Sequence, residues 1–359
     1  MALKLAVPAP GLTAPVLVTG ANGYVGARLV ERLLDAGATV HATVRDVDDS
    51  DRTGHLRALA DRSRGTLSLF AADLLDETGF DDAMAGCGVV FHTASPFIAR
   101  GVQDPAAELV EPARQGTRNV LDAANRTASV ERVVLTSSVA AVYGDAADLS
   151  ETADGRFDES HWNTSTGIHH QPYSYSKTVA ERTAWEIVGA QARWKLVVVN
   201  PGLVLGPALD RRTRSESVSI MRDFGSGLYR FGAPALEFGV VDVRDVAEAH
   251  LRAGTVAEAA GRYILVADTV SLLDIGRILR ARFGSRYPVP RFEVPKPVVS
   301  LLAPTMSVSR DFVTRNVGYP LRFDNRRAVA GLGMRFRAVA DTVAEHFRQL
   351  VEDGLVERR

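Results

Sequence analysis

A tyrosine and a lysine stand four residues apart in the segment Pro172-Tyr-Ser-Tyr-Ser-Lys, at the start of a run with helical character. Residues at positions i and i+4 share one helix face, so Tyr173 and Lys177 should be neighbours, whereas Tyr175 falls on nearly the opposite face. A phenol ordinarily titrates near ~10, and a cation held within about 4–6 Å lowers that pKa. The spacing therefore predicts that Tyr173 donates a proton and that Lys177 lowers its pKa.

A serine that could assist this chemistry follows an apolar strand. Ser138 lies just beyond residues 132–136, at the carboxyl edge of the expected sheet, where doubly wound folds bind their ligands. A carbonyl group that accepts a hydride develops negative charge on its oxygen, which requires a proton donor and a second hydrogen bond. Ser138, Tyr173 and Lys177 are therefore the predicted catalytic residues.

Three glycines interrupt the chain between the first apolar strand and the helical pattern that follows it. A tight turn with positive φ, the approach of a pyrophosphate to bare backbone, and close packing of helix on strand each exclude a side chain. The start of the helix then offers free N–H groups to the phosphates. The spacing is Gly-x-x-Gly-x-x-Gly, a variant of the usual fingerprint, and it predicts dinucleotide contacts from Gly20, Asn22, Gly23, Tyr24, Val25 and Gly26.

The second strand should deliver the residue that recognises the adenosine ribose, about 20 residues beyond the glycines. Arg45 occupies that place, and a guanidinium pairs with a 2′-phosphate through two hydrogen bonds, whereas an acidic side chain would bind the free 2′-hydroxyl. Arg45 thus predicts NADP as the cofactor. Asp46 would favour NAD if it faced the ribose instead.

The elements that position these residues alternate between strands and helices. Apolar runs predict strands at 16–18, 39–44, 66–71, 89–92, 132–136 and 196–199, and helical patterns lie between them, including 105–126 and 173–191. Continuous apolar runs indicate strands buried on both faces of a parallel sheet. We therefore expect an α/β fold with a doubly wound parallel sheet of the Rossmann type.

The pattern changes beyond Pro201. Residues 206–239 show no clean period, although a strand and helix are expected over 240–253, a strand at 262–266, and helices at 272–283 and 338–352. The predicted organisation is an N-terminal arm (1–14), a dinucleotide-binding domain (15–205, with a return segment at 240–255) and a smaller C-terminal substrate-binding lobe (206–239 and 256–359).

Composition limits the classes of partner. The 359 residues are 46% hydrophobic and 24% charged with a net charge of −1, which is typical of a soluble globular protein and favours neither nucleic acid nor a membrane surface. A single cysteine permits no intramolecular disulfide, and the loop histidines 161, 169 and 170 complete no metal site, so we expect no metal and a reducing cytoplasm. The expected partner is a small-molecule carbonyl substrate, with the protein a monomer or homodimer.

With these residues in this order, the chain resembles an extended short-chain dehydrogenase/reductase of the NAD-dependent epimerase/dehydratase superfamily over nearly its whole length. The segments Val134-Leu-Thr-Ser-Ser, Asp158-Glu-Ser-His-Trp-Asn and Tyr173-Ser-Tyr-Ser-Lys-Thr-Val-Ala-Glu resemble dihydroflavonol reductases, cinnamoyl-CoA reductases and NADPH carbonyl reductases. The resemblance implies Ser138, Tyr173 and Lys177 as the catalytic triad, with Lys177 also holding the nicotinamide ribose. It likewise implies Arg45 as the residue that binds the 2′-phosphate.

The resemblance also implies further cofactor contacts. Asp73 and Leu74 would flank the adenine, and the remaining contacts would come from Thr93, Ala94, Ser95, Pro201, Leu203 and Val204. Related dehydratases carry an Asp-Glu pair after the active-site hydroxyl residue, where this chain has Val139 and Ala140, so it lacks their acid for eliminating water.

The expected activity is an NADPH-dependent carbonyl reductase that gives an alcohol from an aldehyde or ketone. Two alternatives within the superfamily are a nucleotide-sugar epimerase and a hydroxysteroid dehydrogenase. An alternative of another class is a non-catalytic NADP-sensing regulator, although such proteins typically lose the tyrosine or lysine that this chain retains. Candidate apolar walls of the substrate pocket include Phe97 and Ile98, which ordinary packing explains equally well.

Overall fold

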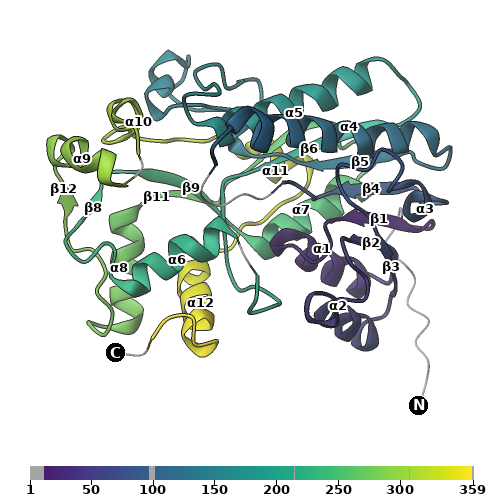
Figure 1. Ribbon diagram of the computed structural model, residues 1–359, viewed down its shortest axis with the longest axis horizontal. Coiled ribbons are helices and arrows are strands. Elements are labelled where there is room, and N and C mark those ends of the chain that lie inside the picture. Colours follow the sequence, from purple (N-terminus) through teal and green to yellow (C-terminus); the bar gives the residue numbers. More distant parts are fainter. Residues whose placement is uncertain (1–11, 97–101, 214, 307, 358–359) are drawn as a thin grey trace.

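The computed structural model describes residues 12–96, 102–213, 215–306 and 308–357, so Phe97, Ile98 and most of the expected N-terminal arm lie outside the described residues. A seven-stranded sheet with strand order β10-β6-β5-β4-β1-β2-β3 runs through the larger part of the molecule (Figure 1). All of its pairings are parallel. The strands are β1 (Val16–Thr19), β2 (Thr39–Val44), β3 (Thr66–Ala71), β4 (Val89–His92), β5 (Arg132–Thr136), β6 (Lys195–Pro201) and β10 (Gly261–Leu265).

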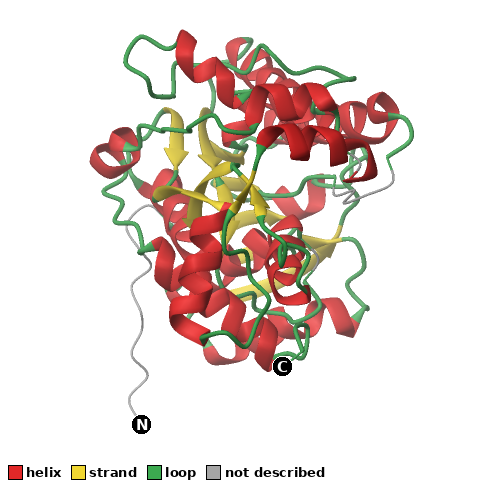
Figure 2. Ribbon diagram, turned by 90° about the vertical axis from the view of Figure 1, so that its left-hand side faces the viewer, coloured by secondary structure: helices red, strands yellow, loops and turns green. Residues whose placement is uncertain are grey.

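Helices cover both faces of this sheet (Figure 2). One face packs against α1 (Tyr24–Asp35), α2 (Ser50–Arg62), α7 (Val243–Thr255) and α11 (Arg326–Gly331). The other packs against α3 (Asp81–Met84), α4 (Glu111–Arg126), which continues the π-helical turn η1 (Ala106–Val110), and α5 (Pro172–Gly189). Strands such as β1 and β4 are buried along their whole length because apolar side chains on both of their faces meet helices.

A second sheet lies beside the first, on the left of Figure 1, where β11 (Asp268–Ser271), β9 (Glu237–Asp242) and β7 (Leu203–Leu205) pair in that order. Its apolar core includes residues of α6 (Glu216–Ser226), α8 (Leu272–Phe283) and α12 (Val339–Glu352). The remaining elements are the strand pair β8 (Ala233–Pro234) and β12 (Glu293–Val294), the helices α9 (Lys296–Leu302) and α10 (Arg310–Asn316), and the 3-10 turns η2 (Val139–Ala141), η3 (Ala146–Glu151) and η4 (Ala303–Met306). In the part of the chain that the structure describes, no helix combines the length and apolar character needed to cross a bilayer.

The predicted doubly wound parallel fold is confirmed, with four strands and α8 at their expected bounds. Three details differ from expectation. Strand β7 belongs to the segment 15–205 that we assigned to the dinucleotide-binding domain, yet it pairs with β9 in the second sheet. Strand β10 belongs to the segment 256–359 that we assigned to the smaller lobe, yet it pairs with β6 at the edge of the main sheet. Helix α6 lies inside 206–239, where the sequence showed no clean helical period. The period is obscured because many residues of this helix are small or polar.

Candidate active site

The glycine-rich turn joins β1 to α1, and two of its glycines are required by geometry. Gly20 has a φ of +65°, and a Cβ there would lie 2.9 Å from the Cα of Ala94. A Cβ at Gly26 would lie 2.3 Å from the carbonyl oxygen of Gly20. Gly23 is the N-cap of α1 and makes no side-chain cap, so the first N–H groups of the helix remain available to a phosphate. The turn therefore fits the pyrophosphate of a dinucleotide.

The other predicted residues of the turn have different surroundings. Val25 packs against the core below the helix, while Asn22 is half-buried. The Tyr24 hydroxyl donates a hydrogen bond to the carbonyl of Gly206, and Arg28 donates to the carbonyl of Pro207 from Nη2 at 2.7 Å. These hydrogen bonds hold the segment after β7 against the start of α1. The contact joins distant parts of the chain, so no local sequence pattern predicted it.

Arg45 directly follows β2 and is exposed at the carboxyl edge of the sheet. Its neighbour Asp46 is engaged in the local turn, where its Oδ1 accepts a hydrogen bond of 2.9 Å from the backbone N–H of Asp48. A carboxylate can accept several further hydrogen bonds, so this contact leaves Asp46 able to bind a hydroxyl. Arg45 and Asp46 both lie exposed at the edge where β2 ends.

The segments after β3 and β4 carry the next group of predicted contacts. Thr93 Oγ1 donates to the carbonyl of Thr19 at 2.6 Å, and the N–H of Ala94 donates to Thr19 Oγ1 at 3.1 Å, which ties this segment to the glycine turn. After β3, the exposed Asp73 accepts from the backbone N–H of Leu75, and the carbonyl of Leu74 accepts from the side chain of Asn119. All of these residues lie at the edge where β1 ends.

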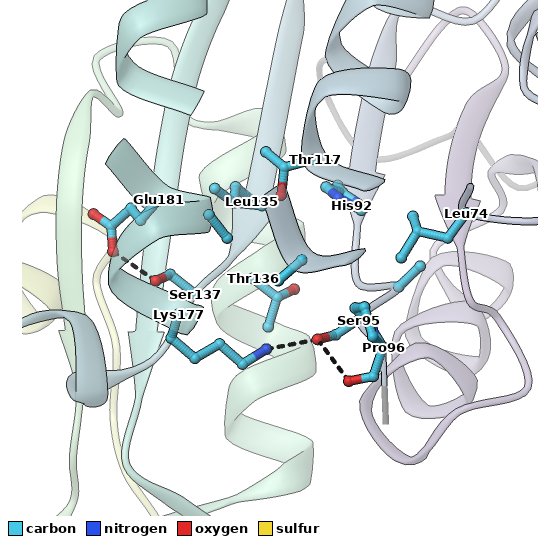
Figure 3. A pocket seen from close by; sticks show the side chains of 13 residues that line it. Leu74, His92, Ser95, Pro96, Thr117, Leu135, Thr136, Ser137, Lys177 and Glu181 are labelled. Atoms are coloured by element: carbon cyan, nitrogen blue, oxygen red, sulfur yellow. Dashed lines mark hydrogen bonds between the residues drawn. The ribbon is translucent and has the colours of Figure 1, made fainter. Parts of the chain in front are cut away.

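A pocket at this edge contains Leu74, Ala94, Ser95 and Lys177 from the predicted set (Figure 3). In Figure 3 the Lys177 side chain points toward Ser95, and its Nζ donates to Ser95 Oγ at 2.7 Å. The same Nζ lies 5.6 Å from the centre of the Tyr173 ring. Lys177 therefore connects the predicted cofactor segment with the predicted proton donor.

Ser138 is the N-cap of η2, which packs against α5. Its Oγ accepts a hydrogen bond from the N–H of Ala140 at 3.1 Å and donates a long one, of 3.5 Å, to the carbonyl of Pro201. Pro201 ends β6, and Leu203 and Val204 begin β7, so all three predicted residues lie where the chain passes from the first sheet to the second. Ser138 thus lies beyond the carboxyl end of β5, and the one hydrogen bond that its hydroxyl is seen to donate is long.

Electrostatics correct one prediction about Tyr173. We expected Lys177 to lower the pKa of the phenol, but the pKa is raised. The main cause is desolvation of the phenol by the surrounding protein, even though 46% of the residue's surface is exposed. The negative charge of the Glu216 carboxylate raises the pKa further. Glu216 begins α6, far away in sequence, so no local pattern could reveal it. Burial lowers the pKa of Lys177 to about 8.

A buried carboxylate beside the pocket was missed by sequence reasoning. Glu181 is fully buried, and it accepts hydrogen bonds from Ser137 Oγ at 2.5 Å, Asn200 Nδ2 at 2.8 Å and Arg262 Nε at 2.6 Å. Asn200 also donates to the carbonyl of Ser138 at 3.1 Å. The available signal was that Glu181 follows Lys177 by four residues on one helix face. Within the described ranges, no group of three or more His, Cys, Asp or Glu residues could hold a metal ion.

Known proteins with similar sequences agree with this geometry. The model of the NAD dependent epimerase/dehydratase family matches residues 16–267. Cinnamoyl-CoA reductase CAD2 of Medicago truncatula is 42% identical over 273 residues, which cover 75% of this chain and 81% of that protein. Cinnamoyl-CoA reductase 1 of Petunia hybrida is 37% identical over 346 residues, which cover 94% of this chain and 92% of that protein.

A solved structure is similar over the same extent. The crystal structure of yeast methylglyoxal/isovaleraldehyde reductase Gre2 complexed with NADPH superposes with a TM-score of 0.77 at 27% sequence identity, covering 96% of this chain and 100% of that chain. The family model and the relatives both span most of the sequence, including the glycine turn and the helix that carries Tyr173 and Lys177. The chain therefore belongs to the NAD dependent epimerase/dehydratase family.

Proposed function

We propose that this protein is an NADPH-dependent carbonyl reductase that converts an aldehyde or ketone to an alcohol, with Tyr173 as the proton donor. The coarser assignment, an NADP-dependent oxidoreductase, follows from the family, from relatives named as reductases and from the NADPH complex of a similar structure. The observation that carries the finer proposal is the position of Lys177 Nζ, 2.7 Å from Ser95 Oγ and 5.6 Å from the Tyr173 ring centre. One ammonium group can thereby serve both the cofactor and the proton donor.

The residues at the sheet edge fit NADPH. We assign the pyrophosphate to the glycine turn, the 2′-phosphate to Arg45, the adenine to Asp73 and Leu74, and the nicotinamide ribose to Lys177. The nicotinamide side of the site comprises Thr93, Ala94, Ser95, Pro201, Leu203 and Val204. When bound, the cofactor supplies the hydride.

The protein's own residues would handle the proton. The Tyr173 phenol is protonated at neutral pH, as any phenol with a pKa of ~10 or above is, and would donate to the substrate oxygen as negative charge develops there. Its raised pKa makes it a weaker acid and does not by itself assist this step. Ser138 would donate a second hydrogen bond to the same oxygen, because its present bond to Pro201, at 3.5 Å, is long enough to be exchanged readily. Lys177, with a pKa of about 8, is mostly protonated at pH ~7.

We propose that the second sheet and its helices supply the substrate pocket. Glu216 supports this assignment, since it begins α6 and its carboxylate contributes, after desolvation, to the raised pKa of the Tyr173 phenol. The substrate class is a medium-sized, partly apolar carbonyl compound. We further propose that the protein works in the reducing cytoplasm, because its sequence holds one cysteine, Cys87, and so can form no intramolecular disulfide.

The test is a panel of aldehydes and ketones, including methylglyoxal and isovaleraldehyde, assayed with NADPH and with NADH by loss of the reduced-nicotinamide absorbance. Cinnamoyl-CoA is assayed beside them as a different reaction, because reduction of this thioester releases CoA and gives an aldehyde. Tyr173→Phe should lower turnover by about 10²–10⁴-fold while NADPH still binds. Tyr175→Phe is the matched control and should retain activity, because residue 175 lies on another face of α5. Full activity in Tyr173→Phe would remove Tyr173 as the proton donor.

The same assay separates the alternatives. A nucleotide-sugar epimerase returns its hydride, so it would convert sugar nucleotides without net loss of NADPH. A hydroxysteroid dehydrogenase would select steroid ketones from the panel. A non-catalytic regulator would bind NADPH and turn over none of the compounds.

A further inference from the structure

Gln171 has an unusual backbone conformation immediately before the helix that carries the proposed proton donor. Its φ of 52° and ψ of 58° are left-handed, and it is the one residue other than glycine with positive φ in the described part of the chain. A left-handed conformation is costly for a residue with a Cβ, and a following proline, here Pro172, disfavours helical conformations further. Strain of this kind persists only where the surroundings hold it in place.

The side chain of Gln171 is held by residues 144 and 145, in the segment that follows Ser138. Its Nε2 donates to the carbonyl of Gly144 at 3.0 Å and to Asp145 Oδ1 at 2.7 Å. Its own carbonyl accepts from the N–H of Tyr175 at 3.1 Å and so forms the first turn of α5, which contains Tyr173. Gln171 thus connects the segment after Ser138 to the start of the helix.

Asp145 is the fixed point of this arrangement. Its carboxylate is fully buried, and besides Gln171 it accepts hydrogen bonds from Asn316 Nδ2 at 2.6 Å and from His170 Nε2 at 2.9 Å. Asn316 also accepts from the N–H of Ala146 through its Oδ1, which locks the last turn of α10 onto the start of η3. Three donors from two distant segments therefore bind one carboxylate and hold it in a fixed position.

We propose that Asp145 is a positioning residue for catalysis: through the Gln171 amide it holds residue 171 in its left-handed conformation and thereby sets where Tyr173 stands relative to Ser138. This inference rests on the proposed function, because it matters only if those two residues act on the same substrate atom. Misplacement of a catalytic group by about 1 Å can cost about 10²-fold in rate, which is the effect that the contact prevents.

The test compares Asp145→Ala with two other variants, using the best substrate of the carbonyl panel. Asp145→Ala should lower kcat by about 10-fold to 100-fold and leave the NADPH dissociation constant, measured by quenching of nicotinamide fluorescence, within about twofold. Adding Gln171→Gly should restore much of kcat, because glycine adopts positive φ without support. A purely structural defect would not be rescued by a change that removes further hydrogen bonds.

Asp148→Ala is the matched control. Asp148 belongs to the same 3-10 turn, where its Oδ2 accepts from the N–H of Asp145 at 3.0 Å and from Ser165 Oγ at 2.6 Å, but it does not contact Gln171. It should lower thermal stability with little change in kcat. Equal losses of kcat in Asp145→Ala and Asp148→Ala, or an unchanged kcat in folded Asp145→Ala, would overturn the proposal.

Two further measurements keep the test decisive. If Asp145→Ala does not fold, Gln171→Ala and Gln171→Gly provide the test, because both lose the side-chain amide but only glycine tolerates the left-handed conformation. A kcat at least about tenfold higher in Gln171→Gly than in Gln171→Ala supports the proposal, and equal kcat values overturn it. Tyr173→Phe assayed beside them separates the two proposals. An inactive Tyr173→Phe with a fully active Asp145→Ala would refute the positioning role alone, whereas an active Tyr173→Phe would refute the proton donor.

Discussion

Among the ion pairs of the described residues, the one between Glu181 and Arg262 is the most deeply buried, so its loss should cost the most stability. Arg262 Nε lies 2.6 Å from Glu181 Oε1, and the exposed fractions of the two side chains are 6% and 0%. Glu181→Gln preserves the shape of the side chain but leaves the guanidinium without its counter-charge in a buried site. Removing one member of such a pair costs about 3–5 kcal/mol.

Other contacts of Arg262 argue for the lower part of that range. Its guanidinium also donates to the carbonyls of Glu159, His161 and Ala141, and its Cζ lies 4.1 Å from the centre of the Trp162 ring. These groups continue to stabilise the cation after the carboxylate is gone. With an unfolding entropy of about 2.1 cal/mol/K per residue, the 359 residues give about 0.75 kcal/mol/K. A loss of about 3 kcal/mol then lowers Tm by about 4 °C.

Scanning calorimetry of three variants tests this estimate. Glu181→Gln and Arg262→Met should each lower Tm, whereas the double variant should lose less than the sum, because no uncompensated charge remains. The matched control is the exposed pair Arg282–Asp341, at 2.6 Å, where Asp341→Asn should change Tm by about 1 °C or less. A Glu181→Gln protein that melts within about 1 °C of the parent would refute the reasoning, as would strict additivity in the double variant.

Two further predictions concern the cofactor. Arg45→Ala should weaken NADPH binding by about 10-fold or more and leave NADH nearly unchanged, since it removes charge-assisted bonds to the 2′-phosphate alone; equal weakening of both cofactors in titrations would contradict the assignment. The pKa of Lys177, lowered by burial to about 8, implies that the free protein loses this cation as pH rises through that value. Binding of an anionic cofactor favours the protonated form, so NADPH affinity should fall above pH ~8, and Lys177→Met should remove this pH dependence. The sign for stability is opposite, because between about pH 8 and 10.4 the unfolded chain binds more protons at this lysine, so its contribution to stability rises with pH.

Much of the sheet could be predicted because strands buried on both faces need no partner to be recognised. β5 has its expected bounds, since its apolar run of residues 133–135 is buried, and β2 has them because it is rich in β-branched residues, although Thr39 is exposed and His41 is half-buried. The bounds of helix α2 were not predicted, because its polar composition leaves only a narrow apolar stripe. The place of β10 depends on its pairing with β6, some sixty residues earlier, which its own sequence does not encode.

In the candidate site, too, some features followed from the sequence and others only from the tertiary structure. The sequence by itself determined the glycine turn, Ser138 at a strand end and the pairing of Tyr173 with Lys177, because each follows from spacing within one element or at one junction. Only the tertiary structure decided the contacts of Glu181 and Asp145 and the direction of the Tyr173 pKa shift, which comes mainly from desolvation of the phenol and secondly from the Glu216 carboxylate of α6. Those contacts join residues from 19 to 171 positions apart, and electrostatic and hydrogen-bond energies depend on distance in space, which spacing along the chain does not reveal.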